Sequence, residues 1–276
     1  MAYRTSSGAR SAAPLASRHG DPPVRPNTTR AKLAAGQAVV GPLLSFNSPE
    51  LVEFCGHIGF DFVLIDAEHN LLGPEPCQHL VRAAESGGLT PLVRVPRNEP
   101  STILGYLETG AQGVVVPHVR STADAQAAVR AVKYPPQGQR SAAGASRPAN
   151  YGLTQSAADY FRAANAETLV IPLIEERAGF EHLEDIGAVP GVDLLFLGDG
   201  DLAMDMGYPG LRDHPEVRGV VDDAVRRGLA AGLALGGPAA TADGVIDLQR
   251  RGFRLTLVPL VGLFGQASRD LLAAAR

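Results

Sequence analysis

Short apolar runs alternate with amphipathic segments from residue 36 to the end of the chain. Eight runs rich in Val, Ile and Leu end in polar or Gly/Pro turns: residues 38–46, 62–68, 90–96, 113–119, 168–175, 193–199, 233–237 and 254–260. Runs with so few polar residues are typical of strands buried on both faces, as in a parallel sheet. The pattern therefore predicts eight parallel strands.

The segments between these runs predict helices, because their apolar residues recur at spacings of three and four. Several begin with Ser, Thr or Pro and end in Gly, as helix caps require. The clearest cover residues 48–59, 74–88, 100–110, 121–133, 215–232 and 241–252. Eight strand-helix units predict an α/β fold, a single-domain (β/α)8 TIM barrel. The alternative is an open doubly wound sheet, but no strand is followed by a G-x-G-x-x-G loop.

Two segments depart from this rhythm. Residues 1–35 mix Ser, Ala, Arg and Pro without an apolar period, which predicts a flexible, disordered N-terminal arm ahead of a barrel domain at residues 36–276. The arm has neither the apolar region nor the amphipathic stripe of a targeting peptide. Residues 134–167 separate a predicted helix from the next strand. A connection of that length predicts a lid or a subunit contact.

Composition narrows the functional classes. The chain has 276 residues and a formal net charge of −4, which gives no reason to expect a nucleic-acid partner. No apolar run reaches the roughly 18 residues of a membrane span, so we expect no membrane association. Two cysteines form neither a disulfide framework nor a zinc cluster, and we expect a cytoplasmic location.

Candidate chemistry lies where strands end, because active sites of (β/α)8 barrels lie at the C-terminal ends of the strands. The polar residues at those positions are Asp66, Glu68, His69, Arg94, His118, Glu175, Glu176, Asp199 and Asp201. Such a set is suited to holding a hard divalent ion together with a substrate. Glu175 ends an apolar run and needs a cation partner, and Arg94 inside LVRVP needs an anion. Asp66 has the alternative role of accepting backbone hydrogen bonds, and His69 that of a rim residue.

Seven sequence blocks, in this order, carry a resemblance to a known family. They are FDFVLIDAEHN (60–70), PLVRVP (91–96), LETGAQGVVVPHV (107–119), YPPQGQRS with ASRPANYG (134–152), ADYFRAAN (158–165), PLIEERAGFEHLEDI (172–186) and LGDGDLAMDMGYPG (197–210). From about residue 36 to 275 the chain resembles the HpcH/HpaI aldolase family, the metal-dependent class II pyruvate aldolases. The resemblance implies a (β/α)8 barrel and a homo-oligomer, a hexamer built as a trimer of dimers, whose C-terminal helix packs on a neighbouring subunit. It also implies reversible cleavage of a 4-hydroxy-2-oxo acid to pyruvate and an aldehyde.

The resemblance also implies roles for individual residues. Glu175 and Asp201 are the expected ligands of Mg²⁺, Mn²⁺ or Co²⁺, and cleavage is expected to pass through a metal-bound enolate. Arg94 is expected to face the 2-oxo oxygen and His69 to transfer a proton, with Glu108 at the position of an acid that pairs with this histidine. The substrate carboxylate is expected to bind at the backbone of the segment formed by Gly198, Asp199 and Gly200. We expect the aldehyde half to contact residues 134–167 and a neighbouring subunit.

Four positions depart from the family pattern. Asp199 replaces a common Pro, Glu108 replaces an Asp, Leu173 replaces a Gln, and residues 258–262 (VPLVG) lack a carboxylate. These departures indicate a retained metal and enolate platform with changed specificity or a changed reaction.

Three functions stay open at this point. The first is the aldolase, the second is a specialised carbon-carbon bond-forming or decarboxylating enzyme on the same platform, and the third is a non-catalytic metabolite-binding barrel. A Schiff-base aldolase is disfavoured, because the two lysines, Lys32 and Lys133, lie outside the predicted strands.

Overall fold

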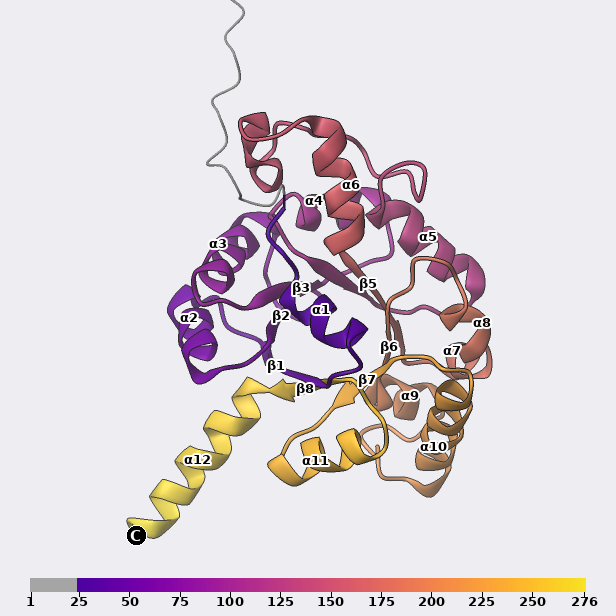
Figure 1. Ribbon diagram of the computed structural model, residues 1–276. Helices are drawn as coiled ribbons and strands as arrows, with labels where there is room; N and C mark the ends of the chain where they lie inside the picture. The colour runs from indigo at the N-terminus through magenta and orange to yellow at the C-terminus, as the bar shows by residue number, and fades with distance from the viewer. Residues whose placement is uncertain (1–23) are drawn as a thin grey trace, which may run out of the picture.

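The computed structural model describes residues 24–276 and shows a closed barrel of eight parallel strands (Figure 1). Each strand pairs with the next along the chain, and β8 closes the ring by pairing with β1. The strands are β1 (Val39–Leu44), β2 (Phe62–Asp66), β3 (Thr90–Arg94), β4 (Gly113–Val116), β5 (Leu169–Ile174), β6 (Leu195–Leu197), β7 (Leu235–Pro238) and β8 (Leu255–Pro259). The predicted (β/α)8 TIM barrel and all eight predicted strands are confirmed.

Helices surround the barrel, and every helix segment predicted from the apolar spacing is found. The twelve α-helices of the described residues are α1 (Thr28–Ala34), α2 (Pro49–Ile58), α3 (Pro74–Ser86), α4 (Pro100–Leu107), α5 (Thr122–Val132), α6 (Ala157–Glu167), α7 (Arg177–Glu181), α8 (Leu183–Gly187), α9 (Asp199–Asp205), α10 (Pro215–Ala230), α11 (Ala242–Arg250) and α12 (Leu260–Ala274). A 3-10 helix covers Arg147–Gly152. Pro at the first turn and Ser or Thr caps start several of them, as at Ser48 and Ser121.

Two apolar cores stabilise the barrel. One fills its interior with side chains such as Phe62, Leu92 and Ile171. The larger one lies between the strands and the surrounding helices and includes Val63, Ile103 and Phe180. Strand β5 is buried at every position, which explains its unbroken apolar run.

Helix α1 lies within residues 1–35, the segment that the sequence predicts as a flexible arm. Residues 1–23 of the predicted arm lie outside the described residues, but Thr28–Ala34 form a helix across the N-terminal end of the barrel (Figure 1). Asn27 caps this helix by accepting a hydrogen bond from the Arg30 amide at 2.8 Å. The Asn27 side chain also donates to the carbonyl oxygens of Gln112 and Glu167, and Thr29 is fully buried. These tertiary contacts order the segment, which is too short and too polar for the spacing of its apolar residues to predict a helix.

The long connection at residues 134–167 contains the 3-10 helix Arg147–Gly152 (η1) and α6, and it packs at the N-terminal side of the barrel. Tyr134 and Tyr160 form a small buried cluster there, and α6 leads directly into the first residue of β5. Within one chain this segment is therefore no lid over the C-terminal ends of the strands.

Helix α12 departs from the compact outline of the barrel. It extends away from the other helices (Figure 1) and has no buried residue. Even its large apolar side chains are exposed, Phe264 by 74% and Leu271 by 71%. We found no helix among the described residues that is long and apolar enough to cross a membrane.

Candidate active site

Carboxylates from two strands and a histidine from a third meet at the C-terminal mouth of the barrel. Glu68 follows β2, His118 follows β4 and Glu175 follows β5, and one ligand atom of each lies within 4.8 Å of the others. Because the strands are parallel, their C-terminal ends all lie at the same rim of the barrel, which brings these three side chains together. Glu68 and Glu175 were predicted as rim residues.

Glu175 is nearly fully buried in the mouth, with 3% of its side chain exposed. The pKa of Glu175 is raised to about 7, mainly by burial; the negative charges of Glu68 and Asp201 add to this shift, and the hydrogen bond from the His118 amide opposes it. That amide lies 2.9 Å from Glu175 Oε1. A buried carboxylate whose neighbours are acids is stabilised by a cation, as the sequence analysis anticipated.

Glu68 is a second acid with a raised pKa, and it lies beside Arg94. Burial raises the pKa of Glu68, and the positive charge of Arg94 opposes that shift. Glu68 Oε2 is buried and has no hydrogen-bond partner among the described residues, although Arg94 Nε lies 3.3 Å away. An oxygen left in this state has lone pairs available for a ligand.

Arg94, at the last residue of β3, is held in place by Asp66 at the last residue of β2. Its Nε and Nη2 atoms each donate to one oxygen of Asp66 at 2.9 Å, a bidentate pair. Burial lowers the pKa of Arg94, but Asp66 and the nearby acids raise it more. Asp66 also accepts from the amides of Glu68 and His69 at 3.2 and 3.4 Å, which is the alternative role that the sequence offered for it. In the described part of the chain Nη1 of Arg94 is left without a hydrogen bond.

His69 and His118 lie on the outer edge of this cluster. His69 is 60% exposed and its Nε2 lies 3.7 Å from Glu68 Oε2, so the imidazole is accessible to a substrate in the mouth. His118 lies closer to the acids, with Nδ1 3.0 Å from Glu176 and 3.4 Å from Glu175. His118 has a φ of 56°, a left-handed backbone conformation that is rare for a residue other than Gly and typical of functional sites.

Asp201 and its neighbours form the β6 side of the mouth. Asp201 is exposed in the first turn of α9, and its charge acts on Glu175. Gly198 approaches Glu175 so closely that an added Cβ would lie 3.0 Å from the Glu175 Cβ. Gly198 therefore borders the carboxylate cluster, and binding of the substrate carboxylate at the backbone of Gly198, Asp199 and Gly200 stays a prediction.

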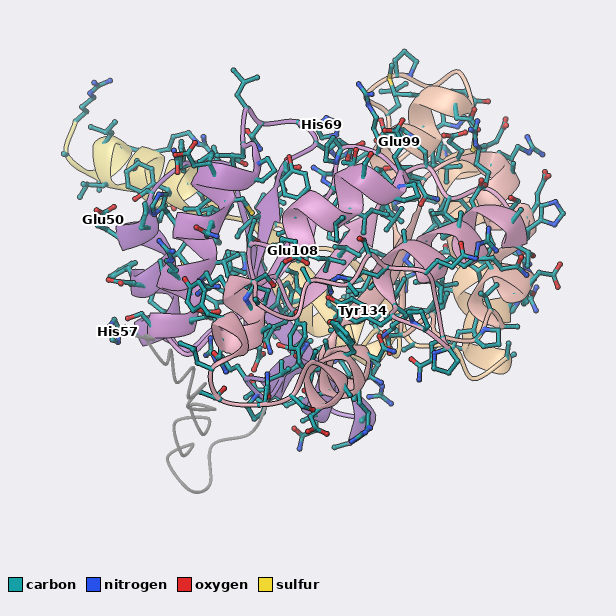
Figure 2. The ribbon with its side chains drawn as sticks, turned by 90° about the horizontal axis from the view of Figure 1, so that it is seen from above. Glu50, His57, His69, Glu99, Glu108 and Tyr134 are labelled. Atoms are coloured by element: carbon teal, nitrogen blue, oxygen red, sulfur yellow. The ribbon has the colours of Figure 1, made fainter. Side chains whose placement is uncertain are left out.

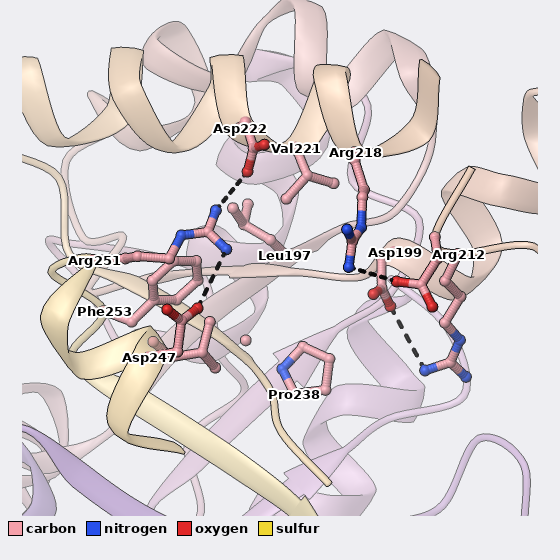
Figure 3. Close-up of a pocket in the computed structure, with 13 residues that line it drawn as sticks. Leu197, Asp199, Arg212, Arg218, Val221, Asp222, Pro238, Asp247, Arg251 and Phe253 are labelled. Atoms are coloured by element: carbon pink, nitrogen blue, oxygen red, sulfur yellow. Dashed lines mark hydrogen bonds and ion pairs between the residues drawn. The ribbon is translucent and has the colours of Figure 1, made fainter. Parts of the chain in front are cut away.

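Asp199 faces away from this cluster toward a separate pocket. It pairs with Arg212 at 3.6 Å on the wall of a cavity of about 510 Å³ between α10 and α11 (Figure 3). Two further pairs, Arg218 with Asp213 and Arg251 with Asp222, line the same cavity. The acid that replaces the family's Pro is therefore neutralised by an arginine of its own chain.

Glu108 does not belong to the mouth of its own chain. It caps the C-terminal end of α4, a helix that starts near the mouth and ends near the N-terminal side, and Figure 2 shows it apart from His69. Its carboxylate accepts from Arg140 at 2.9 Å, and Arg140 is buried over the ring of Tyr134. The structure does not bring Glu108 and His69 together within one chain.

Leu173 is a further departure from the family pattern. Leu173 is buried inside the barrel, so this position offers the mouth no polar group.

The two lysines lie away from the mouth. Lys32 on α1 pairs with Asp61, and Lys133 donates to the carbonyl oxygen of Asn165 at 2.8 Å. Burial lowers the pKa of Lys133 to about 8, a value that suits imine formation, but its contacts place it at the N-terminal side. Neither lysine reaches the mouth.

Comparisons with known proteins agree with this geometry. A family model described as HpcH/HpaI aldolase/citrate lyase matches residues 42–255. A 2-dehydro-3,6-dideoxy-6-sulfogluconate aldolase from Pseudomonas putida is 36% identical over 240 residues, which cover 87% of this chain and 93% of that protein. A hydroxypyruvate/pyruvate aldolase from Sagittula stellata is 38% identical over 197 residues, 71% of this chain and 77% of that protein. The crystal structure of an HpcH/HpaI aldolase/citrate lyase family protein from Burkholderia cenocepacia has a TM-score of 0.85 and 32% identity, covering 91% of this chain and 99% of that one.

Proposed function

The chain belongs to the HpcH/HpaI aldolase/citrate lyase family, and from that premise we propose that it is a divalent-metal-dependent aldolase. The proposed reaction is reversible cleavage of a 4-hydroxy-2-oxo acid to pyruvate and an aldehyde. The observation that carries the proposal is the buried Glu175 at the C-terminal mouth, where Glu68 and Arg94 lie beside it and the charge of Asp201 acts on it. Relatives named as a 2-dehydro-3,6-dideoxy-6-sulfogluconate aldolase and a hydroxypyruvate/pyruvate aldolase support the reaction type.

The donor atoms of the mouth fit a hard divalent cation. Glu68 has a buried oxygen without a partner among the described residues, and burial, with the charges of neighbouring acids, raises the pKa of Glu175. Oxygen donors of this kind suit Mg²⁺ or Mn²⁺ better than softer ions. We assign Glu175 and Asp201 as ligands, with Glu68 as a third acid beside them. His118 is not assigned as a ligand, because its Nδ1 already lies 3.0 Å from Glu176.

A bound cation would act as a Lewis acid on the 2-oxo group of the substrate. Arg94, fixed by Asp66, presents a second positive charge that stabilises the oxygen on which negative charge develops. His69 accepts the proton of the 4-hydroxyl group as the C3–C4 bond breaks, which releases the aldehyde and leaves the electron pair on the pyruvate half. Protonation of that half at C3 completes pyruvate.

We include assembly in the proposal. Helix α12 exposes Val261, Phe264 and Leu271, and α2 exposes Phe54 and Ile58. Apolar surface of this extent is typical of subunit contacts. A second copy of the chain that receives α12 would cover it, and the expected hexamer, a trimer of dimers, is one such assembly. A cytoplasmic location is consistent with Cys55 and Cys77, which are both buried and free.

A panel assay tests the reaction. EDTA-treated protein is supplied with Mg²⁺, Mn²⁺ or Co²⁺ and a series of 4-hydroxy-2-oxo acids, and pyruvate is measured with lactate dehydrogenase. We expect pyruvate release only with metal, and in the reverse direction condensation of pyruvate with an aldehyde. Oxaloacetate is assayed in parallel, because decarboxylation without any aldol cleavage would favour the decarboxylating enzyme. Failure of every substrate and metal would contradict an enzymatic role on this platform.

A further inference from the structure

A second charged cavity lies on the other side of the molecule from the mouth. It has a volume of about 400 Å³ and is lined by three arginines, Arg25, Arg82 and Arg147, and by one acid, Glu85. Arg82 and Glu85 belong to the last turns of α3, which lead toward the N-terminal end of β3. The cavity is therefore separate from the carboxylates at the C-terminal ends of the strands.

The fold holds the guanidinium group of one of these arginines and the backbone of a second. Arg147 is 16% exposed, donates from Nη1 to the Thr109 carbonyl oxygen at 2.8 Å and pairs through Nη2 with Glu85. The backbone of Arg25 is fixed because its carbonyl oxygen accepts from Gln112 Nε2 at 2.6 Å, and Gln112 is itself buried. Groups positioned in advance bind a ligand at a lower entropic cost.

The charges of this cavity are not balanced within the described residues. Glu85 is the one acid, and it already pairs with Arg147, while the C-terminal end of α3 adds only a partial negative charge. Arg25 Nη1 is buried and has no hydrogen-bond partner in residues 24–276. Burial lowers the pKa of Arg25 by more than the charge of Glu85 raises it. A buried guanidinium nitrogen left in this state favours binding of an anion.

We propose that this basic pocket binds a small oxyanion of the phosphate class. Guanidinium groups match the oxygens of phosphate in geometry and charge, and three of them converge on one cavity. Its outer wall contains Asn150 and Tyr151, whose φ values of 50° and 55° are left-handed, so the backbone is strained at the pocket as it often is at binding sites. Tyr151 is 58% exposed and offers its ring to an organic group attached to the phosphate.

Calorimetric titration of the full-length, EDTA-treated protein with inorganic phosphate at constant ionic strength tests this proposal. Removal of metal prevents phosphate from binding a cation at the mouth, and constant ionic strength separates binding from charge screening. We expect saturable binding. Arg25→Gln and Arg82→Gln should each raise Kd roughly tenfold, because each removes a charge-assisted contact. Arg162→Gln is the matched control, since Arg162 is 77% exposed on α6 and pairs with Asp159 outside the pocket.

The variants also distinguish the possible outcomes. Arg82 is exposed, so Arg82→Gln keeps the test valid if Arg25→Gln is unstable. Glycerol 3-phosphate in place of phosphate identifies the source of the anion: tighter binding that Tyr151→Ala removes indicates a phosphorylated metabolite, and equal binding indicates free phosphate. The proposal is overturned if neither ligand binds saturably, or if Arg82→Gln and Arg25→Gln bind as tightly as the unmodified protein.

Discussion

At the scale of single residues, Glu175 is the most informative side chain. It is nearly fully buried, its pKa is raised to about 7 by burial, and its nearest charged neighbours include two acids. A residue with these properties destabilises the metal-free protein and is retained for its function. The sequence indicated this role, because a carboxylate at the end of the apolar run LVIPLI has no other simple explanation.

Glu175→Gln should stabilise the metal-free protein at high pH. An acid whose pKa is higher in the folded than in the unfolded state stabilises folding most below its unfolded pKa, and this contribution is lost as the pH rises through about 7. In EDTA we therefore expect Tm of Glu175→Gln at pH 8 to exceed that of the unmodified protein by about 2–6 °C, and the difference to shrink at pH 5. Scanning calorimetry across this pH range measures it. Glu181→Gln, an exposed acid, is the control, and equal Tm values for both variants at pH 8 would contradict the account.

His69→Asn should lower kcat by about 10²- to 10⁴-fold, the usual contribution of general acid-base catalysis. Because His69 is 60% exposed, the substitution should leave folding and metal affinity unchanged. Steady-state pyruvate release with a 4-hydroxy-2-oxo acid measures the effect. A kcat within about threefold of the unmodified enzyme would exclude His69 from proton transfer.

Two residues of the mouth were given no role by the sequence analysis. Glu68 and His118 were recognised as rim residues, but neither received a role. For Glu68 the signal was present, since a second acid two residues after Asp66 at a strand end is a costly arrangement. The left-handed backbone of His118 and its position between Glu175 and Glu176 depend on the meeting of β4 and β5, which residue spacing does not reveal.

At the scale of secondary structure, periodicity predicted strands and long helices but missed α1. Strands such as β2 and β5 are buried at all positions, so their composition alone identifies them. Helix α1 has seven residues and one buried side chain, and it is ordered by distant partners rather than by its own pattern. A helix this short is unstable without tertiary contacts.

Asn27→Ala should test this dependence. The substitution removes the α1 cap and the two side-chain hydrogen bonds to the carbonyl oxygens of Gln112 and Glu167, so we expect a loss of about 2–4 kcal/mol in the free energy of unfolding. Urea denaturation gives this value. Ser156→Ala, which removes the exposed cap of α6, should cost only about 1 kcal/mol or less. Equal losses would mean that α1 is not anchored to the barrel.

At the scale of the whole molecule, the two ends of the barrel have different roles. The C-terminal mouth gathers acids, while the N-terminal side holds Glu108, Arg140 and the segment 134–167. The expectation that Glu108 and the 134–167 connection serve the substrate is not met within one chain. For Glu108 the sequence contained this signal, because a helix that follows a barrel strand runs back toward the N-terminal ends of the strands and Glu108 lies at the end of such a helix.

Phe264→Asp should weaken self-association, because it places a charge on the exposed apolar face of α12. We expect light scattering after size-exclusion chromatography to show a lower molar mass at equal protein concentration. Asp270→Asn, a polar substitution on the same helix, should leave the mass unchanged. A monomeric unmodified protein, or an unchanged mass for Phe264→Asp, would contradict assembly through α12.

The central claim is that Glu175 and Asp201 hold a divalent cation at the mouth. Titration of EDTA-treated protein with Mn²⁺, in which electron paramagnetic resonance counts the free ion, tests it most directly. We predict one site per chain for the unmodified protein and a Kd at least tenfold higher for both Glu175→Gln and Asp201→Asn. We also predict near-normal binding for His118→Asn, which keeps the backbone donor to Glu175 and tolerates the left-handed conformation. Unchanged Mn²⁺ binding in Glu175→Gln and Asp201→Asn would contradict the account.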